Sequence, residues 1–334
     1  MLTFDMIAQA AERLRDVVIR TPLLESPLLN NALGFRLLIK SECLQKTGSF
    51  KIRGAYNKIA SLDEGQRKAG VVAYSSGNHA QGVAAAASAM GVAAKIVMPS
   101  DAPRIKLDNT AQWGAEVITY DRQTGDRAEI ARDIAEKTGA TLVPPYDDYY
   151  LMAGQGTAGL ELAEQLDVLG VKADRVICPV GGGGLIAGLS TAMLSRHEDT
   201  EIWAAEPRNF DDTKRSLAAG MALSIEPGHS SICDSIVTAR PGKLTFQINL
   251  KTLSGGYSVN EPDVVAAMRV LFTEHKVVAE PGGAVSVAAA LSNNDALQGQ
   301  TIVALVSGGN VDMDSFFGWM AQVGDYPRQI VSSA

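Results

Sequence analysis

Residues 176 to 193 read VICPVGGGGLIAGLSTAM, in which an apolar run leads into four consecutive glycines and then into an alanine- and leucine-rich run. The first run is typical of a buried parallel strand, and the last is typical of a helix. The glycines leave backbone N–H groups free at the start of that helix, where the helix dipole also favours an anion. The stretch therefore predicts a strand–turn–helix unit of an α/β fold that binds a phosphate.

The same strand-then-helix order recurs along the chain. From residue 71 the runs VVAYSS, HAQGVAAAASAMG and AKIVMP read as a strand, a helix and a strand. The amphipathic run through QWGAEVITY follows them and reads as the next helix. GDRAEIARDIAEKTG and TLVPPY repeat the unit, and EIWAAEP, a helix starting at Asn260 and the strand TIVALV follow later. Asn260 suits a helix cap, with Pro262 and Asp263 in the first turn. This order predicts parallel sheets flanked by helices.

The turn-rich stretch PPYDDYY predicts a crossing between two α/β units. We expect a small domain at residues 70–146, inserted into a large domain made of residues 1–69 and 147–334. The length of 334 residues and the 46% of apolar residues allow a core of this size.

The formal net charge of −7 argues against nucleic acid or an anionic membrane as the partner, so a small molecule is favoured. The opening MLTFDMIAQAAERLRD reads as an amphipathic helix and not as a signal peptide, and the sequence shows no transmembrane span. The cysteines Cys43, Cys178 and Cys233 lie far apart, which fits a reducing cytoplasm better than a disulfide framework.

A second helix start directly follows a strand at Ser75, Ser76, Gly77, Asn78 and His79. Serine and asparagine are ordinary helix caps. Hydroxyls, an amide and free N–H groups at one helix start can also hold a carboxylate, the group that all amino acids share. The SGGN stretch that begins at residue 307 ends the strand TIVALV, and ligands gather at such carboxyl ends in open parallel sheets.

A reactive amine is suggested by Lys51, which lies between Phe50 and Ile52 in the stretch GSFKIRG of residues 48–54. Apolar neighbours favour burial of this lysine. A phosphate site, a carboxylate site and one buried amine together predict pyridoxal 5'-phosphate (PLP) as cofactor and an amino acid as substrate.

A dinucleotide site is the main rival interpretation. Read from Gly182 the glycine run is GxGxxA, and Glu206 ends the next strand about 20 residues on, where a ribose-binding acid belongs. A nicotinamide-dependent dehydrogenase would not need Lys51 in its turn, and a non-catalytic metabolite sensor is a further alternative.

The chain resembles the fold-type II PLP enzymes, in the branch of threonine and serine dehydratases and serine racemase. The resemblance covers nearly the whole chain, through KSECLQKTGSFKIRGA, SSGNHAQG, AGQGT, PVGGGGL, AAEP with the following DD, and SGGN, in the family's order. It implies the tryptophan synthase β-like fold, with two open, mostly parallel α/β sheets and the active site between the domains.

The resemblance also implies a role for each motif. Lys51 would carry PLP through its amine, and the loop from Ser75 to His79 would hold the substrate carboxylate. The implied cofactor contacts are Phe50 beside the ring, Asn78 at the ring hydroxyl, Ser307 at the pyridine nitrogen, and Gly181, Gly182, Gly183, Gly184 and Leu185 at the phosphate.

A serine at the pyridine nitrogen does not hold the ring protonated, so the cofactor is a weaker electron sink and β-elimination is favoured over transamination. In the implied mechanism the freed Lys51 takes the Cα proton and the β-hydroxyl leaves as water. The enamine product returns to an imine, which hydrolyses to a keto acid and ammonia. We therefore expect an ammonia-lyase (dehydratase), and serine, threonine and 3-hydroxyaspartate remain open as substrates.

An amino-acid racemase of serine or aspartate type is the alternative on the same scaffold. Ser76 aligns with the serine that acts as acid or base in serine racemase, on the face opposite the lysine. A mere cap and carboxylate donor is the competing role for Ser76.

A divalent cation is implied at a separate place, where Glu206, the carbonyl of Phe210 and Asp212 match the metal position of the metal-dependent members. Hard oxygen ligands suit Mg²⁺, Mn²⁺ or Ca²⁺ rather than zinc. This assignment takes Glu206 away from a ribose.

The resemblance further implies a homodimer. No regulatory domain of the biosynthetic threonine dehydratases follows SGGN, so feedback by isoleucine is not expected. Cysteine synthases typically carry GTGGT where this chain has GGGGL, which makes their β-replacement chemistry the less similar branch.

Overall fold

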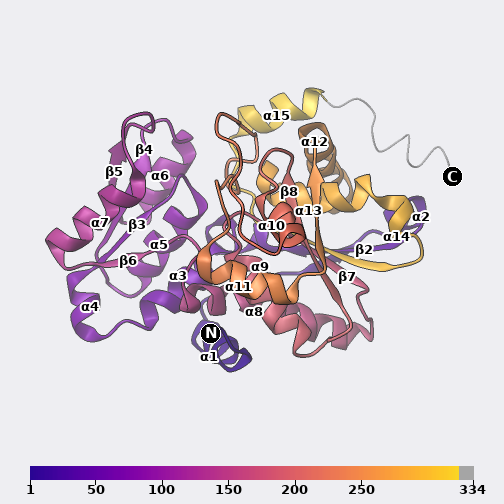
Figure 1. Cartoon of the computed structure of the whole chain (residues 1–334), viewed down its shortest axis with the longest axis horizontal. Coiled ribbons are helices and arrows are strands. Elements are labelled where there is room, and N and C mark those ends of the chain that lie inside the picture. Colours follow the sequence, from indigo (N-terminus) through magenta and orange to yellow (C-terminus); the bar gives the residue numbers. More distant parts are fainter. Residues whose placement is uncertain (323–334) are drawn as a thin grey trace.

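Two separate β-sheets form the framework of the computed structural model, which describes residues 1–322 (Figure 1). Within these residues, six strands form one sheet in the order β1-β2-β10-β7-β8-β9, and four form the other in the order β5-β4-β3-β6. Neighbouring strands are parallel, apart from β1 against β2. The predicted α/β fold with two mostly parallel sheets is therefore confirmed. The strands are β1 (Leu23–Glu25), β2 (Arg36–Ser41), β3 (Val71–Tyr74), β4 (Ala94–Pro99), β5 (Glu116–Tyr120), β6 (Thr141–Val143), β7 (Arg175–Pro179), β8 (Glu201–Pro207), β9 (Gly255–Val259) and β10 (Thr301–Val306).

The helices connect these strands and cover both faces of each sheet. They are α1 (Phe4–Leu14), α2 (Pro27–Leu33), α3 (Lys51–Ala60), α4 (Glu64–Ala69), α5 (Asn78–Ala89), α6 (Arg104–Gln112), α7 (Arg127–Thr138), α8 (Tyr149–Leu169), α9 (Gly184–Leu194), α10 (Asp212–Ala219), α11 (Lys243–Thr252), α12 (Glu261–Val270), α13 (Pro281–Ser292), α14 (Asn294–Leu297) and α15 (Met313–Gln322). The predicted start at Asn260 is confirmed, since its N–H donates to the Asp263 carboxylate at 3.3 Å. The run QWGAEVITY is divided instead: α6 ends at Gln112, and the β-branched part forms β5.

Alternation of side chains along the strands separates two cores of the large sheet. Leu38, Val303 and Leu305 face α8 and α9, whereas Leu37 and Ile302 face α12 and α13. Successive side chains of a strand point to opposite faces, so apolar residues at every position indicate a sheet that is covered on both sides. This explains why the strands read as continuous apolar runs in the sequence.

The small sheet is covered by α3 and α5 on one face and by α7 on the other. Its four strands lie between residues 71 and 143, within the range proposed for the small domain. Helix α3 precedes that range, yet Ile52, Ala55 and Ile59 pack in the same core as α5. Figure 1 shows the two sheets as two lobes, with α3 where they meet. Within residues 1–322 no helix combines the length and the apolar character needed to span a lipid bilayer.

Candidate active site

The predicted amine lies in a pocket between the two lobes. Lys51 is the first residue of α3, and its Nζ donates a hydrogen bond to the carbonyl of Pro145 at 2.7 Å. The Nζ atom is 5.3 Å from the centroid of the Phe50 ring. Desolvation disfavours the charged form of the amine and lowers the pKa of Lys51 to about 8. About a tenth of this lysine is therefore a neutral amine at pH 7, far more than for a lysine of ordinary pKa.

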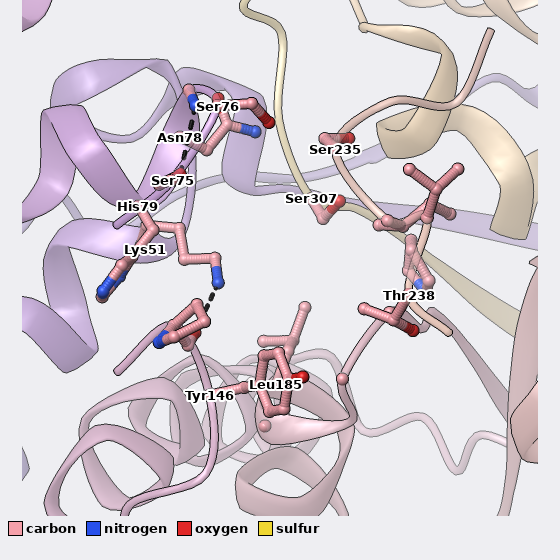
Figure 2. A pocket seen from close by; sticks show the side chains of 18 of the residues that line it. Lys51, Ser75, Ser76, Asn78, His79, Tyr146, Leu185, Ser235, Thr238 and Ser307 are labelled. Carbon is pink, nitrogen blue, oxygen red and sulfur yellow. Dashed lines mark hydrogen bonds between the residues drawn. The ribbon is translucent and has the colours of Figure 1, made fainter. Parts of the chain in front are cut away.

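The loop of residues 75–79 forms the wall of the pocket on the side of the four-stranded sheet (Figure 2). It joins the end of β3 to the start of α5, and the N–H of Gly77 donates to the Ser75 hydroxyl at 3.1 Å. No side chain caps α5 by a hydrogen bond, so the N–H groups of its first turn remain available. Hydroxyls and N–H groups at the positive end of a helix suit a carboxylate.

His79 lines the same pocket as a neutral imidazole. Its Nε2 lies 3.0 Å from the Val143 carbonyl, which can only accept, so the proton is on Nε2. Burial, with the charge of Lys51, lowers the pKa of His79 to about 3. Its Nδ1 is buried without a hydrogen-bond partner among the described residues. His79 therefore brings no positive charge to the pocket at neutral pH.

Asn78 is held at both ends of its amide. Its Nδ2 donates to Glu280, and its Oδ1 accepts from Asn310 Nδ2 at 2.8 Å. Glu280 directly precedes α13 and Asn310 follows β10 of the six-stranded sheet, so this predicted cofactor contact also joins the two lobes. The two hydrogen bonds fix the orientation of the amide.

The glycine loop lies on the side of the six-stranded sheet, between β7 and α9. A Cβ atom built at Gly182 would lie 2.3 Å from the ring of Tyr146, so the close contact requires glycine. The carbonyl of Gly182 accepts from the Thr245 hydroxyl at 2.7 Å, which anchors the loop from below. No side chain caps α9, a helix of 11 residues, so its first N–H groups are free to bind an anion. The loop therefore fits a phosphate group, and the buried Leu185 follows it.

The far wall of the pocket carries three hydroxyls. Ser307 follows β10 and is 4% exposed, as predicted from its place at a strand end. Ser235 and Thr238 come from the irregular segment between α10 and α11. The Ser235 hydroxyl is buried without a partner within the described chain, whereas the Thr238 hydroxyl is near the Asp212 carboxylate and lowers its pKa. Figure 2 shows these side chains across the cavity from Lys51. All predicted catalytic, cofactor-binding and substrate-binding residues thus line one pocket.

Two cationic side chains that the sequence analysis did not single out, Arg127 and Lys106, also line the pocket. The Arg127 guanidinium lies 5.8 Å from the centroid of the Tyr74 ring, and no carboxylate within residues 1–322 forms an ion pair with it. Burial alone would lower the pKa of Lys106, but the carboxylates of Glu280 and Asp234 raise it above its ordinary value. Lys106 is therefore held as an ammonium, whereas the pKa of Lys51 is lowered.

The predicted metal ligands lie outside this pocket. The carboxylate of Glu206 is fully buried and accepts backbone N–H bonds from Thr213 at 2.9 Å and Lys214 at 2.8 Å. These contacts point it at the start of α10, which explains why the ribose interpretation of Glu206 does not hold. Both carboxylate oxygens of Asp212 are buried without a partner at hydrogen-bond geometry among the described residues, and the nearby Thr238 hydroxyl lowers the pKa of this carboxyl.

The surroundings of Glu206 and Asp212 shift the pKa values of both carboxyl groups. Burial raises the pKa of Asp212 to about 7, and burial with the neighbouring Asp212 raises the pKa of Glu206 well above its usual value. Two buried carboxylates with free lone pairs are a donor set that suits a hard cation. Within residues 1–322 no group of three or more Asp, Glu, His or Cys side chains forms a metal cage, and the predicted set has two carboxylates and a carbonyl.

Comparisons with known proteins agree with this geometry. The family model described as "Pyridoxal-phosphate dependent enzyme" matches residues 14–308. The L-threonine ammonia-lyase of Thermotoga maritima is 44% identical over 94% of this chain and 77% of its own length. The L-threo-3-hydroxyaspartate ammonia-lyase of a Pseudomonas species is 41% identical, over 93% of this chain and 96% of its own. The structure of maize serine racemase superposes with a TM-score of 0.88, at 37% identity over 96% of this chain and 97% of that one.

Proposed function

The chain belongs to the family of pyridoxal-phosphate-dependent enzymes, and we propose that it is an ammonia-lyase that removes water from a β-hydroxy amino acid. The observation that carries this proposal is one pocket that joins a lysine of lowered pKa, a glycine loop with free N–H groups, and a second helix start suited to a carboxylate. The products would be a keto acid and ammonia.

The residues of the pocket fit PLP. The glycine loop would hold its phosphate, Phe50 would pack beside its ring, and Lys51 would carry it. When bound, PLP supplies an electron sink for the charge that develops on Cα of the substrate. Asn78 would contact the ring hydroxyl, and the neutral hydroxyl of Ser307 would face the ring nitrogen, which suits elimination.

The protein residues would position the substrate and move its proton. The loop of residues 75–79 would bind the substrate carboxylate, with hydroxyls and N–H groups at the positive end of α5. Lys51 Nζ, neutral in part because of its lowered pKa, would take the proton from Cα. The nearby His79 is uncharged and does not compete for the carboxylate as a cation.

The charge of the pocket favours a second carboxylate on the substrate. Arg127 lines the cavity with no ion-pair partner within residues 1–322, and a buried or half-buried guanidinium is best satisfied by a carboxylate in a bidentate contact. The buried, unpartnered hydroxyl of Ser235 offers a further donor. We therefore propose 3-hydroxyaspartate as the preferred substrate over serine and threonine.

This choice is tested by assaying 3-hydroxyaspartate stereoisomers beside serine and threonine, with and without Mg²⁺, by keto-acid and ammonia release. We expect the dicarboxylate to be preferred, and Arg127→Gln to lower kcat/KM for it by about 100-fold, since loss of a charged contact that the bound substrate would bury costs ~2–5 kcal/mol. The same variant should change kcat/KM for threonine by less than about threefold. Equal turnover of all substrates, with no selective effect of Arg127→Gln, would contradict the assignment.

Racemisation is the second candidate activity, because Ser76 lines the pocket together with Lys51. A base that removes the Cα proton on one face, together with a protonated group that returns a proton on the opposite face, would invert its configuration. Chiral analysis of the recovered substrate in the same assay separates the two activities: the enantiomer without keto acid would replace the lyase proposal by a racemase.

We also propose a divalent cation at Glu206, Asp212 and the carbonyl of Phe210, supported by the unpartnered oxygens of Asp212. Its role would be structural, because the predicted ligands lie outside the pocket. The Mg²⁺ arm of the substrate assay tests this proposal. A homodimer and a cytoplasmic location remain proposals as well; exposed apolar side chains such as Met313 and Phe317 on α15 and three free, buried cysteines are consistent with them.

The lowered pKa of Lys51 predicts how cofactor uptake depends on pH. Only the neutral amine attacks an aldehyde, so the rate of PLP uptake by cofactor-free protein should rise about tenfold per pH unit below pH 8 and level off above it. Stopped-flow measurement of the visible absorbance of bound PLP checks this profile. A rate that keeps rising towards pH 10.5, the ordinary pKa of lysine, would contradict the lowered value.

A further inference from the structure

The pocket contains a second lysine, Lys106, for which the proposed reaction has no role. It lies on α6 in the small domain, and its side chain is 4% exposed. Its Nζ is 2.9 Å from Asp234 Oδ2 and 3.6 Å from Glu280 Oε2. Asp234 lies between α10 and α11 and Glu280 directly precedes α13, so both carboxylates belong to the large domain. One buried ammonium thus joins the two domains beside the pocket.

The stem of Lys106 also supports the loop of residues 75–79 from behind. A Cβ atom built at Gly77 would lie 2.4 Å from Cδ and 3.1 Å from Cε of Lys106. The backbone of the loop can approach the methylene groups this closely only because residue 77 has no side chain. The position of Lys106 therefore constrains the position of Gly77, in the middle of the loop.

Glu280 connects Lys106 to the other end of the same loop. Its Oε1 accepts from Asn78 Nδ2, while its Oε2 has no hydrogen-bond partner within residues 1–322 and faces Lys106. A fully buried carboxylate needs a compensating charge, and Lys106 supplies it. Removing that charge would leave Glu280 to protonate or to draw in water, and either response disturbs its contact with Asn78.

We propose that Lys106 is a positioning residue that fixes the substrate-carboxylate loop against the large domain. The inference rests on the proposed function, since the loop of residues 75–79 is taken to bind the carboxylate of the amino acid. That carboxylate is the same in the ground state and in the transition state. An interaction that binds both states equally affects KM rather than kcat, so displacement of the loop should act mainly on KM.

The test is Lys106→Met, which keeps the apolar stem and removes the charge. We expect KM for the best amino-acid substrate to rise about tenfold to 100-fold, with kcat changed less than about threefold and with wild-type PLP content. Lys106→Arg keeps a cation within reach of both carboxylates and should restore KM to within about threefold of the wild-type value.

Lys95→Met is the matched control, because Lys95 pairs with Glu116 at 2.6 Å on the outer surface of the same domain. It should leave KM unchanged. A Lys106→Met protein that loses kcat and thermal midpoint at unchanged KM would have lost only a structural contact, and the proposal would be wrong. If Lys106→Met does not fold, Asp234→Asn gives the same measurement at a side chain that is 41% exposed, and an unchanged KM would again overturn the proposal.

The readout separates this inference from the proposed function. If the wild-type protein binds PLP but releases no keto acid, the lyase proposal fails, and glycine can be titrated against the visible absorbance of bound PLP instead. A weaker apparent Kd for glycine in Lys106→Met than in the wild type supports the positioning role, and an equal Kd refutes it.

Discussion

Replacement of Lys51 by alanine is expected to abolish keto-acid formation, with kcat/KM falling at least about 10⁴-fold. Lys51 would serve both as the attachment point of PLP and as the base at Cα, so both roles disappear together. Its amine is the one in the described part of the pocket that is not held as an ammonium by carboxylates. Steady-state assay of keto acid, with PLP in excess, measures the loss.

Attachment can be measured independently of turnover. Borohydride converts the link between a lysine amine and an aldehyde into a stable bond, and peptide mass analysis then shows which lysine carries the cofactor. We expect the label at Lys51 in the wild type and in Lys106→Met, and no label in Lys51→Ala. A label on Lys106 in any of these proteins would show that the assignment of the reactive lysine is wrong.

The fold could be predicted because its signals are local. Continuous apolar strands and the amphipathic or alanine-rich helices between them can each be recognised within a short stretch of sequence. The parallel sheets follow from the alternation of these strands and helices. The division of QWGAEVITY between α6 and β5 was missed because a short amphipathic run has no clear period. The part of α3 in the core of the small sheet was also missed, since packing partners distant in the sequence decide it.

The residues of the candidate site also fall into two groups, those that the local sequence marks and those that only the folded chain brings to the pocket. Lys51, the loop of residues 75–79 and the glycine loop are each a contiguous motif at the end of a strand, and the pocket contains them all. Arg127 and Lys106 lie on ordinary helices with nothing in the local sequence to mark them. Their presence in the pocket depends on how the two domains face each other, which a single sequence does not record.

The sequence also did not mark three other residues of the pocket, which are Tyr146, Ser235 and Thr238. Tyr146 belongs to the PPYDDYY stretch, which the sequence marks as a crossing between domains, and the same crossing places its ring against the glycine loop. Ser235 and Thr238 come from an irregular segment without a periodic pattern, so only their place in the pocket of the folded chain indicates a role.

Replacement of Arg53 by methionine is expected to lower the free energy of unfolding by about 3–5 kcal/mol. Arg53 is fully buried and donates to Glu42 at 2.7 and 2.8 Å and to Glu161 at 2.8 and 3.0 Å. Lys40 Nζ contacts Glu161 at 2.9 Å, so two cations balance two carboxylates in this cluster. Methionine would leave Glu42 buried with its main partner lost. Urea and thermal unfolding, followed by circular dichroism, measure the change.

Two further variants separate the buried charge from lost packing. Arg36→Met removes an exposed pair with Glu25 at 2.8 Å and should cost less than about 1 kcal/mol. Adding Glu42→Gln to Arg53→Met should recover part of the loss, because the uncompensated carboxylate is then neutral. A double variant as unstable as the sum of its parts would mean that packing, and not charge, explains the effect.

The pH dependence of the same variant gives a second signature. In the wild type, burial raises the pKa of Glu42, but its cationic neighbours, Arg53 above all, lower it by more, so the net shift is downward. The free energy of unfolding therefore falls as the pH drops through the folded-state pKa. Without Arg53, only the charge of Lys40 and the hydrogen bond from Thr21 still lower the pKa of Glu42, and we expect burial to outweigh them, so that the folded-state pKa lies above the unfolded one. Stability of Arg53→Met should then fall as the pH rises through that window. The difference between the two proteins should therefore narrow as the pH approaches the ordinary pKa of glutamic acid.

The cluster also bears on the reactive lysine. Residues two apart on an α-helix are about 200° apart around its axis, so Arg53 and Lys51 point to opposite sides of α3. The contacts of Arg53 with Glu42 and Glu161 fix the rotation of α3, and that rotation directs Lys51 into the pocket. Folded Arg53→Met should accordingly bind PLP more weakly than wild type, whereas Arg36→Met should bind it normally. Absorbance titration with PLP tests this link, in buffer without urea and at a temperature well below the thermal midpoints of both variants. Equal affinity for PLP in the two variants would refute it.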